Sequence, residues 1–492
     1  MPRFAYASLI RIATMLFRQF FDPKLAQYAY LVGCQKSKEA LLIDPLRDVD
    51  QYLKAAADEG VRIVAVAETH IHADFLSGAR QLAADDGVKL YLSDEGAADG
   101  WASNWAKGDG YDVVVLRHGD TLQIGNIGIK ALHTPGHTPE HLSYQITDHG
   151  GGAEEPMGIV TGDFVFVGDL GRPDLLESAA KVENVMRPSA QKLYSSAKDF
   201  MELSDYLQVW PGHGAGSACG KALGAVPQTT VGYEKRFNSM LNAARKGEDA
   251  FVDAILDGQP EPPLYFARMK RLNRDGVPLL KGLPNPSALS AGDIEAGLPE
   301  GSVLIDARMD RSAFMARHVE GAQYAPFDKQ FNTTVGSLVA DPELPLVLLL
   351  PEQDVPQAVR DLIRVGFDNI THYITPEVFA LYVQAGGETT SIEEIDFAEL
   401  EKRRDNKAGA VVDVRRKTEY DAGHVPGAVN AAHARLPDLL DRIPSGKQLL
   451  IHCQSGVRSA VAASYLAREG YDAVYVNDAF PRYVELARAV AE

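Results

Sequence analysis

Short apolar segments separated by turn residues dominate the first half of the chain. Four of them have the length and composition of strands, at residues 29–32, 39–43, 63–68 and 113–116. They alternate with helical stretches and with turns that contain Gly or Asp. Strands that alternate with helices are typical of α/β folds. We therefore expect one α/β domain over residues 15–257.

A proline-rich segment follows this first block. Pro260, Pro262 and Pro263 lie within residues 258–285, and proline interrupts regular structure. We expect a linker over this segment. Its basic stretch, residues 268–274, is interpreted as a solvated linker or helix face.

The remainder of the chain contains one pattern twice. Residues 303–326 (VLIDARMDRSAFMARHVEGAQYAP) align with residues 411–433 (VVDVRRKTEYDAGHVPGAVNAAH). The alignment pairs Asp306 with Asp413, His318 with His424 and Gly321 with Gly427. The offset of roughly 105 residues is the size of a domain rather than of a solenoid repeat. Strands and helices alternate in each copy, so we expect two parallel α/β domains, at residues 286–386 and 391–492.

Histidine and aspartate residues follow apolar runs at several predicted strand ends of the first domain. They are His70, His72, Asp74, His137, Asp163 and His213. Side chains at the carboxyl ends of buried strands converge on a cleft, where they can share an ion. The order HxHxD, H, D, H resembles that of the metallo-β-lactamase fold. This resemblance implies an αββα sandwich for residues 15–257.

The residue after Asp74 departs from that pattern. Members of the fold that hold two metals carry His there, whereas this chain has Phe75. Phenylalanine has no lone pair, which weakens the case for a binuclear zinc hydrolase such as glyoxalase II. A single ion held by His70, His137 and Asp163 would have two imidazole ligands and one carboxylate. That set leaves three positions open and suits Fe(II) that reacts with O₂.

Four longer segments make the resemblance more specific. ETHIHADFLSGARQLA, HTPGHTPEHLSY, TGDFVFVGDLGRPDL and GHGAGSACGKALG resemble the persulfide dioxygenases, and in particular the CstB-like fusions that carry two rhodanese modules. The resemblance spans nearly the whole chain from Met15. It implies one Fe(II) per chain, with His70, His137 and Asp163 as ligands. His72, Asp74 and His213 would then form hydrogen bonds around the iron or be remnants of a second metal site.

Three further residues need an interpretation: Arg172 and Cys219 each have two, and Cys34 has one. Arg172 either binds a carboxylate or phosphate of the carrier thiol or forms a structural pair with Asp174. Cys219 is either a buried structural thiol or a persulfide relay, the second because it follows His213 by only a few residues. We expect Cys34 to lie in the core.

Cys453 lies at the end of a buried strand, and Arg458 follows in a C-x4-R loop that leads into a helix near Val457. Backbone N–H groups of such a loop, together with the helix N-terminus, lower the pKa of a thiol and make it a nucleophile. With Asp413 and Arg415 upstream, this segment resembles a rhodanese. The first copy has no Cys and places Asp354 where Arg458 would stand. We therefore expect it to be degenerate and to serve as a spacer or interface.

Composition limits the choice of partner and compartment. The net charge of −18 argues against a nucleic-acid partner. Three scattered cysteines argue against a disulfide scaffold and favour the cytoplasm. No apolar run reaches the roughly 18 residues that a membrane span needs. Residues 1–14 are expected to be a disordered extension.

These observations predict oxidation of low-molecular-weight thiol persulfides with O₂ to sulfite or thiosulfate, coupled to rhodanese sulfur transfer in sulfide detoxification. The related fusions suggest a homo-oligomer. Two alternatives stay open at this point. One is a zinc-dependent thioester hydrolase of the glyoxalase II type, fused to a rhodanese. The other is a non-catalytic carrier or sensor of sulfane sulfur that uses Cys219 and Cys453.

Overall fold

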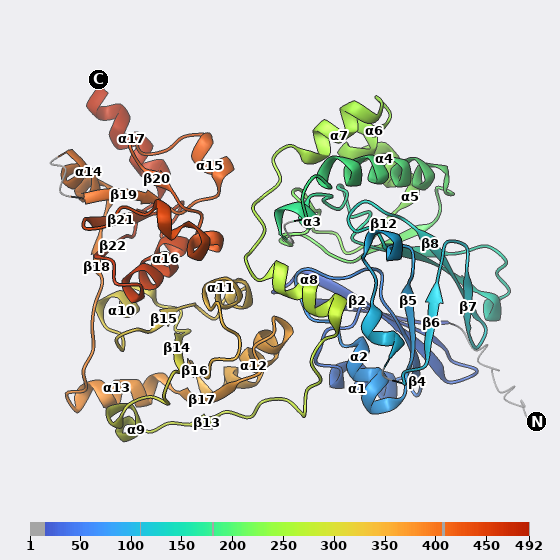
Figure 1. Ribbon diagram of the computed structural model, residues 1–492, viewed down its shortest axis with the longest axis horizontal. Coiled ribbons are helices and arrows are strands. Elements are labelled where there is room, and N and C mark those ends of the chain that lie inside the picture. The colour runs from blue at the N-terminus through green and yellow to red at the C-terminus, as the bar shows by residue number, and fades with distance from the viewer. Residues whose placement is uncertain (1–14, 109, 180–181, 406–408, 492) are drawn as a thin grey trace, which may run out of the picture.

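The structure is a computed structural model that describes residues 15–108, 110–179, 182–405 and 409–491. The extension predicted at residues 1–14 lies outside the described residues. Figure 1 shows an N-terminal body on one side and two smaller α/β units on the other, with the chain passing between them through one helix. In the part of the chain that the structure describes, every helix is too short or too polar to cross a membrane.

The N-terminal domain is built from two six-stranded sheets with the orders β1-β2-β3-β4-β5-β6 and β12-β11-β10-β9-β8-β7. The first sheet contains β1 (Met15–Asp22), β2 (Gln27–Cys34), β3 (Glu39–Ile43), β4 (Arg62–Ala67), β5 (Lys89–Ser93) and β6 (Val113–Leu116). The second contains β7 (Thr121–Ile124), β8 (Ile127–His133), β9 (Leu142–Asp148), β10 (Gly158–Gly162), β11 (Gln208–Pro211) and β12 (Thr229–Thr230). All four predicted strands are confirmed, each within two residues.

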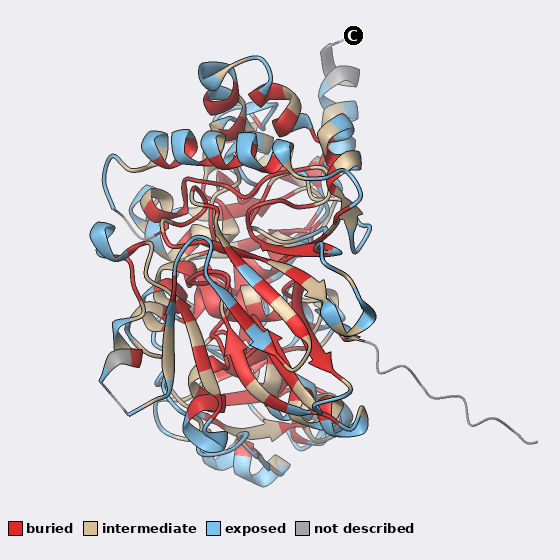
Figure 2. Ribbon diagram, turned by 90° about the vertical axis from the view of Figure 1, so that its right-hand side faces the viewer, coloured by how far each residue is buried: buried red, intermediate tan, exposed pale blue. Residues whose placement is uncertain are grey.

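The two sheets pack face to face, and helices cover both outer faces. One cluster joins Tyr30 and Ile43 of the first sheet to Tyr144 and Val160 of the second. The outer helices are α1 (Asp50–Asp58) and α2 (Ala79–Asp86) on one side, and α4 (Met186–Glu202), α5 (Val231–Phe237), α6 (Ser239–Ala244) and α7 (Glu248–Leu256) on the other, while α3 (Leu175–Ser178) precedes α4. Figure 2 shows the buried residues concentrated along the sheets. The predicted αββα sandwich is confirmed.

The two C-terminal units share one topology. Their strand orders, β13-β17-β16-β14-β15 and β18-β22-β21-β19-β20, correspond position by position, and the paired strands are parallel. The first unit contains β13 (Ser287–Ala288), β14 (Val303–Asp306), β15 (Gln323–Tyr324), β16 (Leu346–Leu349) and β17 (Ile370–Ile374), with α9 (Ala291–Ala296), α10 (Arg311–Ala316), α11 (Phe331–Leu338), α12 (Val355–Arg364) and α13 (Pro376–Gln384). The second contains β18 (Glu393–Ile395), β19 (Gly409–Asp413), β20 (Val429–Asn430), β21 (Gln448–His452) and β22 (Ala473–Val476), with α14 (Phe397–Asp405), α15 (Lys417–Asp421), α16 (Val457–Arg468) and α17 (Phe480–Ala491). The internal repeat predicted from the sequence is therefore a repeat of structure.

The segment predicted to be a linker contains helix α8 (Phe266–Asp275). Figure 1 shows α8 between the N-terminal domain and the first α/β unit. Phe266 and Met269 point into the core, and Lys270 and Asn273 are buried beside them. The prediction of a solvated basic face over residues 268–274 was wrong for the side of the helix that carries these residues. Apolar residues spaced three apart share one face of a helix, and here that face meets the protein rather than water.

Helix α12 of the first α/β unit attaches that unit to the N-terminal domain. The buried guanidinium of Arg364 donates to Asp48 at 2.8 and 2.7 Å and to Asp22 at 2.5 Å. Its backbone carbonyl accepts a hydrogen bond from Leu76 N, at 2.7 Å, in the loop that follows β4. The degenerate copy therefore serves as an interface that supports this loop.

Replacing Arg364 by Met leaves the buried carboxylates of Asp22 and Asp48 without their main partner. We expect the free energy of unfolding to fall by about 3–5 kcal/mol, since breaking a buried ion pair from one side leaves an uncompensated charge. Urea unfolding measures the change. Arg360→Met is the matched control. Arg360 lies one turn earlier in α12, and its partly exposed guanidinium pairs mainly with Asp50. Its loss should therefore lower the free energy of unfolding much less. Equal losses in the two variants would contradict the assignment.

Candidate metal centre and thiol site

Three loops at the ends of β4, β8 and β10 bring His70, His137 and Asp163 together. All three side chains are buried. Asp163 Oδ2 lies 3.8 Å from His70 Nε2 and 3.6 Å from His137 Nε2. The three ligand atoms lie within 4.8 Å of one another, close enough for one ion to contact all of them.

The three converging atoms have no hydrogen-bond partner, whereas the other polar atoms of the same side chains do. His137 Nδ1 donates to the carbonyl of Arg172 at 2.9 Å, and His70 Nδ1 lies 2.9 Å from Thr69 Oγ1. Burial lowers the pKa of both imidazoles well below the ordinary value, so each keeps a lone pair. Unpartnered buried polar atoms cost free energy, and a metal ion is the partner that fits two imidazole nitrogens and a carboxylate oxygen.

His213 orients Asp163 instead of offering a ligand atom. Its Nδ1 lies 2.6 Å from Asp163 Oδ1 and its Nε2 lies 2.8 Å from Asp74 Oδ2. Burial works to lower the pKa of His213, but the two carboxylates outweigh it and raise the value to about 10. Both ring nitrogens therefore donate. Asp74, His213 and Cys219 lie close enough together to hold a second ion, but both nitrogens of His213 already form hydrogen bonds and the adjacent Phe75 offers no ligand atom.

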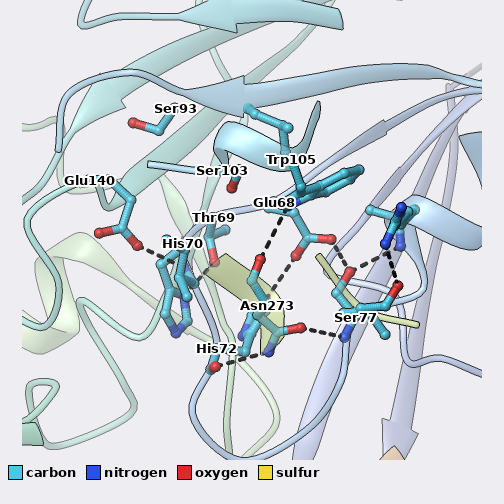
Figure 3. Close-up of a pocket in the computed structure, with 15 residues that line it drawn as sticks. Glu68, Thr69, His70, His72, Ser77, Ser93, Ser103, Trp105, Glu140 and Asn273 are labelled. Atoms are coloured by element: carbon cyan, nitrogen blue, oxygen red, sulfur yellow. Dashed lines mark hydrogen bonds and ion pairs between the residues drawn. The ribbon is translucent and has the colours of Figure 1, made fainter. Parts of the chain in front are cut away.

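His72 lies beside His70, with ring centres 4.2 Å apart, but it is not one of the three converging residues, and its Nε2 contacts two other carboxylates. Its Nε2 lies 3.0 Å from Glu68 Oε2 and 3.2 Å from Asp44 Oδ1. Asp44 also accepts from Thr69 N and Thr69 Oγ1, both at 2.7 Å. This second cluster fixes the loop that carries His70. Figure 3 shows Glu68 to the right of Thr69 and His72 below it, with Asn273 alongside His72.

Arg172 forms the structural pair that was one of its two interpretations. It is buried, and its Nε and Nη2 donate to the two oxygens of Asp174, each at 2.7 Å. Its Nη1 donates to the carbonyl of Ala218 at 3.2 Å. All three nitrogens of the guanidinium therefore donate to groups of the protein, and the buried side chain is not placed to bind the anionic groups of a carrier thiol.

Cys219 lies beside the metal centre, in one cluster with Asp74 and His213. It is buried, and burial raises the pKa of its thiol well above the ordinary value, with the carboxylates of Asp74 and Asp163 adding to the effect. A thiol relay needs a thiolate. The position therefore suits contact with the metal centre, while the electrostatics suit a protonated structural thiol. Cys34 is buried in β2, as expected.

The sequence analysis missed two charged residues of this region. Glu140 is buried, its Oε1 accepts from Ile71 N at 2.7 Å, and burial raises its pKa to about 7. Figure 3 shows it beside His70. Lys270 of α8 is fully buried, and its Nζ has no hydrogen-bond partner. Glu140 stands inside the motif that carries His137, which was a usable signal. The sequence around Lys270 contained no such signal, because its burial depends on how α8 packs against the rest of the protein.

The second α/β unit carries the thiol site. Cys453 Sγ accepts from Gly456 N at 3.2 Å and from Ser459 Oγ at 3.4 Å, at the start of α16. Gly456 has a φ of 87°, and a Cβ there would meet Asn477 Oδ1 at 2.7 Å, so the loop needs glycine. Arg458 donates to both oxygens of Glu419, at 2.6 and 2.8 Å.

Asp413 and Arg415 form a buried ion pair at the end of β19, the strand next to the one that leads into Cys453. Arg415 Nε and Nη2 donate to Asp413 at 3.0 and 2.7 Å, and Nη2 also donates to the carbonyl of Gly423 at 2.6 Å. The first unit keeps an equivalent pair, in which Arg308 Nε and Nη2 donate to Asp306 at 2.9 and 2.6 Å, but it has no cysteine. Asp354 precedes α12 there, and a carboxylate at the start of that helix would repel a sulfur anion.

Two family models match the chain. Residues 22–213 match the metallo-beta-lactamase superfamily, and residues 396–480 match the rhodanese-like domain. The mitochondrial persulfide dioxygenase ETHE1 of Bos taurus is 30% identical over 171 residues, which is 34% of this chain and 60% of that protein. The human protein of the same name is 28% identical over the same shares. The chain spans about three fifths of the length of these curated relatives.

A solved structure matches over a longer stretch. The metallo-beta-lactamase from Staphylococcus aureus subsp. aureus COL is 38% identical, with a TM-score of 0.64, and the match covers 74% of this chain and 99% of that one. The chain belongs to the metallo-β-lactamase superfamily, carries a rhodanese-like domain at its C-terminal end and counts persulfide dioxygenases among its relatives.

Proposed function

We propose that the protein oxidises low-molecular-weight thiol persulfides with O₂ to sulfite and passes sulfane sulfur through Cys453 to form thiosulfate. The pathway would serve cytoplasmic sulfide detoxification. The observation that carries the proposal is the convergence of two imidazole nitrogens and one carboxylate oxygen, all unpartnered, in a chain related to persulfide dioxygenases. The occupied nitrogens of His213 and the apolar Phe75 count against the binuclear hydrolase.

The oxidation balances as RSSH + O₂ + H₂O → RSH + SO₃²⁻ + 2H⁺. An Fe(II) ion held by His70, His137 and Asp163 would supply the redox chemistry that a spin-forbidden reaction of O₂ with a persulfide needs. The protein residues hold the ligands in place. The carbonyl of Arg172 fixes the ring of His137, and His213 fixes the carboxylate of Asp163, so neither must reorganise during turnover.

Sulfur transfer uses the second site. The Cys453 thiolate attacks the terminal sulfur of a persulfide RSSH and the S–S bond breaks, giving Cys453–SSH and the thiolate RS⁻, which takes a proton from water. Sulfite then takes that sulfur: Cys453–SSH + SO₃²⁻ → Cys453–SH + S₂O₃²⁻. The N–H of Gly456 and the hydroxyl of Ser459 stabilise the thiolate, and the N-terminus of α16 adds its dipole.

A cavity of about 460 Å³ supports the coupling of the two reactions. Asp74, Ser217 and Ala218 of the N-terminal domain line one part of it, and Arg416 and Arg458 of the rhodanese-like unit line another. Asp74 is the partner of His213, and Arg458 belongs to the Cys453 loop. Sulfite released into this cavity would reach Arg458, in the loop of Cys453, at a high effective concentration.

Metal analysis combined with oxygen-electrode assays tests the proposal. We expect one iron per chain, and O₂ uptake with a persulfide of glutathione, coenzyme A, cysteine or bacillithiol, with sulfite or thiosulfate as product. Paired zinc ions together with O₂-independent cleavage of S-lactoylglutathione would overturn it. Persulfide binding without turnover would instead support the carrier or sensor.

A further inference from the structure

Lys270 is a charged side chain that the fold buries without a hydrogen-bond acceptor. None of its surface is exposed, and Nζ forms no hydrogen bond or ion pair within the described residues. The charge of Glu140 acts on it and the ring of Trp101 lies nearby, but neither supplies the direct contact that a buried ammonium needs. The missing acceptor indicates that a ligand can supply this contact.

The face of α8 that carries Lys270 covers the loop of the metal centre. Three residues later on the same face, Asn273 donates to the carbonyls of His72 and Phe75 at 2.9 and 2.7 Å and accepts from Ser77 N at 2.9 Å. Residues three apart on a helix are neighbours. The hydrogen bonds of Asn273 thus hold Lys270 over this loop.

Other buried groups without partners surround Lys270. Its Nζ lies 5.6 Å from the centre of the Trp101 ring, whose indole N–H has no acceptor. Glu140 Oε2 is also unpartnered. Glu140 Oε1 accepts from Ile71 N at 2.7 Å, and Trp101 packs in one cluster with Ile71, so both side chains lie next to the loop that carries His70.

The charges of the region favour binding of an anion. Asp163 and Asp74 are bridged by His213, and a divalent ion on the three converging atoms would leave the centre net positive beside Lys270. A small anion that reaches the centre would then be held by opposite charge in a site with little water, where such contacts are strong.

We propose that Lys270, assisted by the indole N–H of Trp101, forms an anion subsite beside the metal centre that binds the anionic sulfur group of the substrate persulfide and of sulfite. The identity of the anion rests on the proposed function. Lys270 acts here as a positioning residue for the negative end of the reacting molecule.

Calorimetric titration of the anaerobic, metal-loaded full chain with sulfite tests this. We expect Lys270→Met to weaken sulfite binding by about 10- to 100-fold, as loss of a charge-assisted contact predicts. Lys270→Arg should stay within about threefold of wild type, because it keeps the charge. Arg271→Gln, which removes an exposed charge next in the chain, is the matched control and should bind as wild type does. Metal content should be equal in all four proteins.

Thermal unfolding separates this role from a structural one. Lys270→Met should raise Tm, because it removes an unpaired buried charge, while the KM for persulfide rises more than kcat falls. A lower Tm with unchanged sulfite affinity in Lys270→Met would overturn the subsite. So would a sulfite affinity that is the same in Lys270→Met and in the wild type. If the wild type consumes no O₂ yet binds sulfite through Lys270, the subsite stands and only the proposed function fails.

Discussion

Replacement of His137 by Ala will yield protein without its metal ion, and persulfide-dependent O₂ uptake will fall by more than about 100-fold. The loss of residues that merely orient metal ligands already costs 10–100-fold, and His137 supplies one of the three converging atoms. Elemental analysis of the purified variant and an oxygen electrode measure both effects. Circular dichroism should show that the αββα sandwich is retained, because the domain core lies between the sheets.

His72→Gln is the matched control for this prediction. His72 lies in the loop after β4, two residues from His70, and is as buried as His137, but its Nε2 contacts Glu68 and Asp44 and it is not one of the three converging residues. The variant should keep its metal and lose no more than about 10–100-fold in activity. If His72→Gln lost the ion as completely as His137→Ala does, both histidines of the H-x-H motif would be ligands and the proposed iron set would be wrong.

The strands of the sandwich could be predicted because their signals are local. Residues 39–43 and 113–116 are apolar runs bounded by turns, and both were found without error. Strand β2 is buried along its whole length, with helices on one face and the second sheet on the other, so it shows no alternation of polar and apolar positions. Its centre was predicted, while its ends were two residues off.

Helix α8 could not be predicted, because tertiary contacts decide its environment. The Arg- and Lys-rich stretch reads as a solvated surface on composition alone. Asn273 bonds to carbonyls about 200 residues earlier in the chain, and that docking buries Lys270. One sequence carries no record of such a contact. The most informative charge near the metal centre thus lay in the segment that was interpreted as a linker.

Motif order gave six candidate residues, and the resemblance to persulfide dioxygenases singled out His70, His137 and Asp163 as ligands. The structure brings free atoms of these three together. The role of His213 depends on two hydrogen bonds to residues far away in the sequence. Arg172 had two interpretations, and only the fold shows that its side chain closes on Asp174.

The first α/β unit has an interface with the N-terminal domain where the second unit has its thiol site. Where the second unit opens a thiolate loop before α16, the first unit has Asp354 before α12. Helix α12 holds no sulfur anion, and its Arg364 donates instead to two buried carboxylates of the N-terminal domain. The backbone of Arg364 also reaches the metal loop through Leu76. This unit therefore links the stability of the interface to the geometry of the metal centre.

Replacement of Cys453 by Ser will lower sulfur transfer from thiosulfate to an acceptor by at least about 10³-fold, because a serine hydroxyl does not form the anion that the loop stabilises. O₂ uptake with a thiol persulfide should stay within about threefold of wild type, since the metal centre lies in another domain. The product should shift from thiosulfate to sulfite. Cys34→Ser, which alters a buried thiol of β2 far from both motifs in the chain, should leave both activities intact. Equal loss of both activities in Cys453→Ser would show that the two reactions share one site, and the division of labour between the domains would fail.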